Sequence, residues 1–186
     1  MDHVIGQIDR AIDSTAAIID AVEATHLTAP TLCAEWDVRA VLNHIVGSMY
    51  SFAAAVSKTD IDHEPDWLAS DPQAAYAAAA EVGRAAWHRP DALEATVVLP
   101  FAEVPAAAAA QIHLMEILAH GADVAVAIDR ADLLDEQLCE EVLTTLRALG
   151  GIDAFRKEGA FGPEVLVAAD APAHRRLLAY LGREIR

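Results

Sequence analysis

Apolar residues recur every three or four positions along most of the chain, which is the spacing of amphipathic α-helices. The first such stretch covers roughly residues 3–25. The second begins at Asp37, a residue type suited to capping a helix N-terminus, and continues to residue 57. A third runs from Pro72, which favours the first turn of a helix, to Trp87. The first half of the chain therefore predicts three helices joined by polar connectors.

The pattern changes after residue 93. β-Branched residues flanked by prolines predict a short strand or hairpin within residues 94–104. A long Ala-rich helix then covers 106–128, another covers 133–149, and a short one covers about 172–183. We expect an all-α fold, a four-helix bundle with a short β-hairpin excursion and a small C-terminal helix, as one domain over residues 1–186.

The charge of the chain narrows the set of partners. It carries 29 acidic and 13 basic residues, a net charge of −16. The negative electrostatic field of such a chain repels phosphate backbones and anionic lipid surfaces, so we expect neither nucleic acid nor a membrane as a partner. The N-terminal residues lack the basic and apolar segments of a signal peptide, and polar residues interrupt the Ala/Val-rich stretches. A cytoplasmic location is the expectation.

One face of the helix over 106–128 is apolar at both ends and polar in the middle. Its polar members are His113, Glu116 and His120. A buried, unpaired carboxylate is costly, and a divalent cation would satisfy this cluster. Glu116 and His120, four positions apart, can chelate one ion, whereas His113 lies roughly 10.5 Å along the axis from His120. Two alternatives stay open, namely chelation by His113 with Glu116 and an exposed Glu–His pair without metal.

A third ligand must come from another helix, and His44 is the candidate. It lies about 60° beyond Val41 on the flank of the apolar stripe, which suits the edge of a pocket. A solvated or capping role is the alternative for this residue. The remaining histidines lie near helix ends or in loops and are expected at the surface: His3, His26, His63, His88 and His174.

The two cysteines do not predict a protein nucleophile. Cys33 and Cys139 are far apart, lack CxxC spacing, and are expected to be reduced. Cys33 lies in a connector and is expected to have no cationic neighbour. Cys139 lies in the acidic segment EQLCEE, which would raise the pKa of its thiol. Phosphate-binding and nucleophile-elbow motifs are also missing from the sequence.

Three segments carry a family resemblance. They are PTLCAEWDVRAVLNHIVG, then LPFAEVPAAAAAQIHLMEILAHGADVAVA, and finally FGPEVLVAADAPAHRRLLAYLGRE. In this order they resemble the mycothiol-dependent maleylpyruvate isomerase-like family, within the DinB-like metal-binding helical superfamily. The resemblance implies a four-helix bundle that holds zinc or nickel at one end, with His44, Glu116 and His120 as the ligands. Two histidines and one carboxylate with an open position suit a catalytic zinc.

The same resemblance implies a chemistry. The metal binds a low-molecular-weight thiol, mycothiol, as a thiolate that attacks a small electrophile, in S-transfer or isomerisation. A non-catalytic metal or small-molecule binding bundle and a structural homodimer are the alternatives. Larger members carry an extra C-terminal domain that contributes to the isomerase site, and we expect a short member without it.

Other side chains are expected near the site without an assigned role. Asp123 could orient a ligand or pair with Arg39. His113 and Arg176 are further candidates for contacts with a ligand or substrate. Arginines that might hold the thiol cofactor are Arg39, Arg84, Arg175, Arg176 and Arg183.

Overall fold

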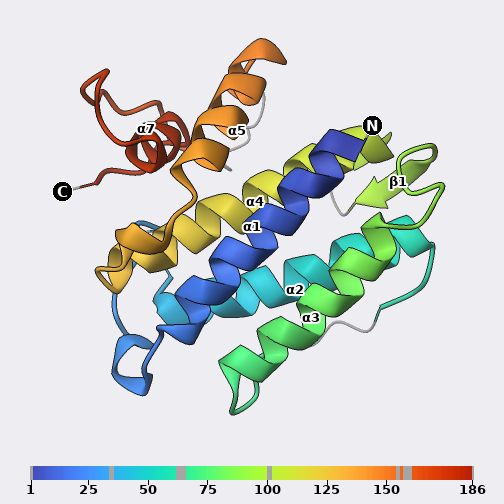
Figure 1. The fold of residues 1–186 in the computed structure, drawn as a ribbon, viewed down its shortest axis with the longest axis horizontal. Coiled ribbons are helices and arrows are strands. Elements are labelled where there is room, and N and C mark those ends of the chain that lie inside the picture. Colours follow the sequence, from blue (N-terminus) through green and yellow to red (C-terminus); the bar gives the residue numbers. More distant parts are fainter. Residues whose placement is uncertain are drawn as a thin grey trace.

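The computed structural model describes residues 2–33, 36–61, 66–99, 102–153, 156 and 161–185. Four long helices form a bundle in which α1 packs on α3 and α4, and α2 packs on α3 and α4 (Figure 1). Their bounds are Asp2–Asp20 for α1, Val38–Ser57 for α2, Pro72–Trp87 for α3 and Ala106–Ala127 for α4. The predicted four-helix bundle is therefore confirmed.

Two smaller units complete the fold. Strands β1 (Thr96–Leu99) and β2 (Ala102–Pro105) form the predicted hairpin, antiparallel with Val97 opposite Val104. At the other side, α5 (Glu136–Ala148) and α7 (Ala173–Tyr180) pack on each other, and α7 also contacts α4. Short 3-10 turns cover Ala24–His26 and Ala131–Leu133. Figure 1 shows α5 and α7 together beside the bundle, with α7 near the C-terminus.

Side-chain caps explain where the helices begin. The Asp37 carboxylate accepts a hydrogen bond from the Ala40 amide at 2.8 Å, as its position in the sequence predicted. Asp71 caps α3 and Asp135 caps α5 in the same way. The prediction that the first helix reaches residue 25 was wrong. The helix ends at Asp20. The amides of Ala21 and Val22 donate hydrogen bonds to carbonyls three residues earlier instead of four, which is the pattern of a 3-10 turn.

The core consists of apolar side chains, mostly aliphatic, from all four long helices, with further members from β1, α5 and α7. Its largest fully buried members include Ile8, Ile12, Leu42, Ile45, Met49, Trp87, Leu114 and Leu118. Helix α2 reaches the length and mean hydropathy, 1.2, of a membrane span, and half of that window is buried in the bundle. Length and composition of this kind also occur in core helices, which is the place of α2 here.

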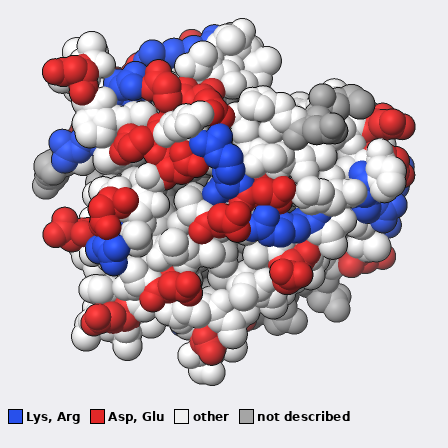
Figure 2. All heavy atoms as spheres, viewed as in Figure 1, with Lys and Arg blue, Asp and Glu red and all other residues white. Residues whose placement is uncertain are grey.

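Ion pairs join the helices at the surface. Arg10 of α1 pairs with Asp135 at 2.8 Å and Glu141 at 3.2 Å, and Arg84 of α3 pairs with Asp9 at 2.8 Å. Figure 2, which has the same view as Figure 1, shows acidic side chains spread over the visible face, with basic ones lying among them. Exposed pairs of this kind contribute less than about 1 kcal/mol each, so packing dominates the stability of the bundle.

Gly121 sets the distance between α1 and α4 one residue after His120. A Cβ atom at this position would lie 2.6 Å from the Oγ1 of Thr15, a residue that is only 1% exposed. We expect Gly121→Ala to lower the free energy of unfolding by about 1–3 kcal/mol, because Thr15 or the helix must shift. Urea denaturation measures this value.

Gly83 in the middle of α3 is the matched control. A Cβ there meets nothing within 4 Å. Gly83→Ala should therefore stabilise the protein by up to about 1 kcal/mol through its higher helix propensity. Equal effects of the two substitutions would show that the contact at Gly121 does not limit the packing.

Candidate metal centre

Three donor atoms from α2 and α4 converge at one point. His44 lies in the second turn of α2, and Glu116 and His120 are one turn apart on α4. Glu116 Oε2 lies 2.8 Å from His44 Nε2 and 3.6 Å from His120 Nε2. The three ligand atoms lie within 4.8 Å of one another. The side chains are 35%, 23% and 10% exposed for His44, Glu116 and His120, so a small molecule can reach this point.

The charge at this point suits a cation. Burial alone would raise the pKa of Glu116, but the hydrogen bond with His44 and the nearby His120 lower it below its usual value. The carboxylate is therefore ionised at neutral pH. The two imidazole rings lie edge to face, with centroids 4.7 Å apart. An ionised carboxylate and two imidazole nitrogens form the donor set that zinc takes in catalytic sites.

The opposite edge of the His120 ring is held by Asp123. His120 Nδ1 lies 3.1 Å from Asp123 Oδ2, and the Asp123 side chain is fully buried. A carboxylate that accepts the Nδ1–H bond fixes the tautomer and leaves Nε2 free to bind a metal. The geometry thus supports the ligand-orienting role considered for Asp123. The alternative partner was wrong, because Arg39 binds both oxygens of Asp66 at 2.9 Å.

Cys33 lies behind the same histidine. Its Sγ lies 3.2 Å from Asp123 Oδ2, 3.7 Å from Arg183 Nη2 and 3.9 Å from His120 Nδ1. The expectation that Cys33 lacks a cationic neighbour was wrong, because the fold brings Arg183 to it from the end of the chain. Burial, and next the Asp123 charge, nevertheless raise the pKa of the thiol to about 12. Cys33 is therefore a protonated hydrogen-bond donor at neutral pH.

Trp36 covers one side of the three donor atoms. Its ring centroid lies 4.8 Å from that of His44 and 5.8 Å from that of His120, and the residue is 37% exposed. The connector holds it through hydrogen bonds from Thr31 to its carbonyl oxygen. Sequence reasoning missed this residue, although its position directly before the Asp37 cap places it near the first turns of α2.

His113 belongs to the core of the bundle. It is fully buried, stacks on Phe52 with centroids 4.6 Å apart, and accepts a hydrogen bond from Trp87 Nε1 at 2.8 Å. Burial lowers its pKa to about 3, so the ring is neutral with its hydrogen on Nε2. Within the described part of the chain, Nε2 has no hydrogen-bond partner and His113 joins no group of convergent metal ligands.

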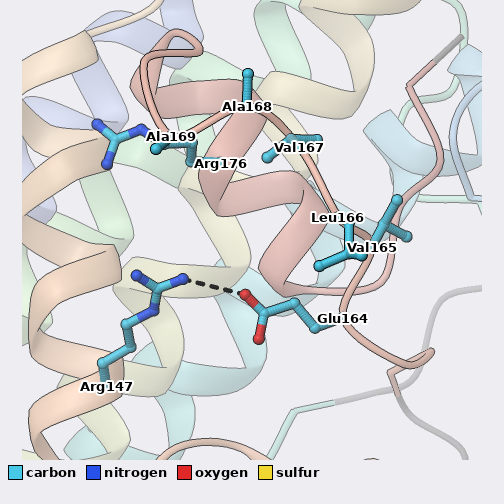
Figure 3. A pocket seen from close by; sticks show the side chains of 8 residues that line it. All are labelled: Arg147, Glu164, Val165, Leu166, Val167, Ala168, Ala169 and Arg176. Carbon is cyan, nitrogen blue, oxygen red and sulfur yellow. Dashed lines mark hydrogen bonds and ion pairs between the residues drawn. The ribbon is translucent and has the colours of Figure 1, made fainter.

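Arg176 lines a different pocket, between α5, α7 and residues 164–169. This pocket has a volume of about 270 Å³ and is shown in Figure 3, where Arg147 pairs with Glu164 at 3.1 Å. Arg176 itself pairs with Glu140 of α5. The structure therefore places Arg176 away from the donor atoms of the candidate metal centre.

The other histidines were expected at the surface, and the structure confirms this for only some of them. His3 and His88 are exposed and His26 is half-buried, whereas His63 lies outside the described residues. The surface position expected for His174 was wrong. It is 6% exposed because its backbone amide and Nδ1 both bond the Glu136 carboxylate on α5.

The chain is similar to known sequences. Residues 8–125 match the family model of the mycothiol maleylpyruvate isomerase N-terminal domain. Two proteins of Mycobacterium tuberculosis, "Uncharacterized protein MT0763" and "Uncharacterized protein Rv0738", are each 35% identical over 179 residues. Each alignment covers 95% of this chain and 96% of the relative. No solved structure matches the chain significantly.

Proposed function

Because this chain belongs to the family of the mycothiol maleylpyruvate isomerase N-terminal domain, we propose that it is a metal-dependent, thiol-using transferase. One divalent ion binds His44, Glu116 and His120, with zinc as the first candidate and nickel as the second. The thiol is mycothiol, and the acceptor is a small electrophile. The observation that carries the proposal is the convergence of two imidazole nitrogens and one ionised carboxylate oxygen at a solvent-accessible point between α2 and α4.

The residues of the chain divide the work between them. A zinc ion bound here would lower the pKa of a coordinated thiol, which makes it a nucleophile at neutral pH. The Glu116 carboxylate would offset part of the metal charge. Asp123 orients the His120 ring through its Nδ1 atom, so that Nε2 is available to the metal. Trp36 shields one side of the site from water and presents an apolar surface to the group that carries the thiol.

The chain needs no nucleophile of its own in this scheme. Burial raises the pKa of Cys139 to about 12, as it does for Cys33, so both thiols stay protonated. We expect the Cys33→Ser/Cys139→Ser variant to keep thiol-transfer activity within about twofold, since serine preserves the hydrogen bond from position 33 to Asp123. Steady-state rates with monobromobimane as electrophile, at matched zinc content, measure this. A loss of turnover with zinc retained would assign the nucleophile to the protein.

A thiol panel tests the proposed activity as a whole. Zinc-loaded protein is incubated with monobromobimane and either mycothiol, glutathione, cysteine or buffer alone. We expect enzyme-dependent consumption of mycothiol that disappears after zinc removal and returns when zinc is added back. Zinc binding without acceleration for any thiol would instead favour a non-catalytic metal-binding bundle.

A further inference from the structure

The Arg183 side chain, three residues after the end of α7, is buried beside the candidate metal centre. Helix α7 ends in a turn in which the Gly182 amide bonds the Ala179 carbonyl and the Arg183 amide bonds the Leu178 carbonyl. Gly182 takes a φ of +85°, a conformation that glycine adopts without strain. This turn reverses the chain and directs Arg183 towards α4. Arg183 is only 9% exposed, and it lies outside the family match over residues 8–125.

The Arg183 guanidinium is bound on several sides. Nε donates to Asp123 Oδ1 at 3.3 Å, Nη2 donates to Asp123 Oδ2 at 3.2 Å, and Nη1 donates to the Leu181 carbonyl at 3.3 Å. Its charged end also lies 5.8 Å from the centre of the Phe161 ring. The two bonds from Arg183 to the two oxygens of Asp123 have the geometry in which arginine binds a carboxylate and lysine cannot. The contact fixes the plane of the Asp123 carboxylate as well as its position.

Asp123 would be costly to bury without this partner. Its side chain is fully buried, and a buried ionised carboxylate is tolerated only when it is paired and hydrogen-bonded. Arg183, His120 Nδ1 and the Cys33 thiol together surround its two oxygens. Arg183 is the only one of these three groups with a permanent positive charge.

We propose that Arg183 is a positioning residue of the metal centre, which holds Asp123 so that His120 presents Nε2 towards His44 and Glu116. The C-terminal segment is thereby part of the centre, although it supplies no ligand. This inference rests on the proposed metal site. Loss of an outer partner of a metal-binding histidine typically weakens metal affinity 10–100-fold, and we expect a loss of that size for Arg183→Met.

The experiment is a zinc titration in competition with a fluorescent chelator. It compares the full-length wild type with Arg183→Met, Arg183→Lys and the control Arg176→Met, which removes an arginine of α7 paired with Glu140 outside the site. Arg183→Met should bind zinc roughly 10–100-fold more weakly and Arg183→Lys should fall between it and the wild type. Arg176→Met should match the wild type. Wild-type affinity in folded Arg183→Met would overturn the proposal.

A second pair of variants covers the case in which Arg183→Met does not fold. Asp123→Asn keeps the shape of the side chain and removes the buried negative charge that needs a counter-ion. We expect Asp123→Asn to weaken zinc binding, and Asp123→Asn/Arg183→Met to weaken it no further, because Arg183 acts through Asp123. Additive losses in the double variant would overturn the proposal. Wild-type affinity in Arg183→Met, or additive losses in the double variant, would overturn the role of Arg183 and leave the proposed function standing. A wild type that binds no zinc would overturn the proposed function itself.

Discussion

His44→Ala and His120→Ala are each expected to purify without stoichiometric zinc, whereas the wild type carries about one ion per chain. Each substitution removes one of three donor atoms that lie within 4.8 Å of one another, and the two that remain form a weak site. Metal analysis by inductively coupled plasma mass spectrometry gives the zinc content directly. Circular dichroism checks that the variants keep their helices.

Two other histidines serve as controls for this result. His88→Ala removes an exposed histidine paired with Asp9 and should bind zinc like the wild type. His113→Ala should also keep zinc, but at a cost of about 2–5 kcal/mol in stability, because it leaves a cavity between Phe52 and Trp87. A loaded His120→Ala protein beside an empty His113→Ala protein would show that His113 and Glu116 form the chelate instead.

Removal of the metal is expected to lower the melting temperature by roughly 10 °C while the helices remain. Zinc at a thousandfold excess over its Kd adds about 4 kcal/mol of stability, and 1 kcal/mol corresponds to about 2–4 °C in a chain of this size. The core does not depend on the ion, since the buried aliphatic side chains of the four helices pack on one another. Thermal scans followed by circular dichroism, with and without a chelator, measure the shift.

The control for this shift is the His44→Ala variant, whose melting temperature should not respond to the chelator. A random-coil spectrum of the wild type after chelation would contradict the account, because it would make the metal a condition for folding. An unchanged melting temperature would show that the native state holds no ion under these conditions.

The sequence predicted the parts of the structure that depend on neighbouring residues. Helical spacing, the Asp37 cap and the prolines around the hairpin were sufficient to place α2, α3, α4 and the two strands within one or two residues. The i, i+4 relation of Glu116 and His120 is also local, so their convergence followed from helix geometry. His44 needed the family resemblance, because spacing along α2 could not show what it faces.

The surroundings of the donor atoms depend on contacts between distant segments. Asp123 meets Cys33, 90 positions earlier, and Arg183, 60 positions later. A pattern along one helix contains no information on such partners, so Arg39 was as plausible as Arg183. The burial of His174 has the same origin, because Glu136 comes to it from α5.

X-ray absorption at the zinc edge shows whether the metal binds the thiol, with the Cys33→Ser/Cys139→Ser protein loaded with zinc and measured with and without mycothiol. Without thiol, we expect only nitrogen and oxygen neighbours of the zinc at about 2.0–2.2 Å. On addition of mycothiol, a sulfur neighbour at about 2.3 Å should appear. This variant has no cysteine, so a zinc–sulfur contact that appears only on addition of mycothiol comes from the added thiol. A zinc environment that does not change when the thiol is added would contradict the account.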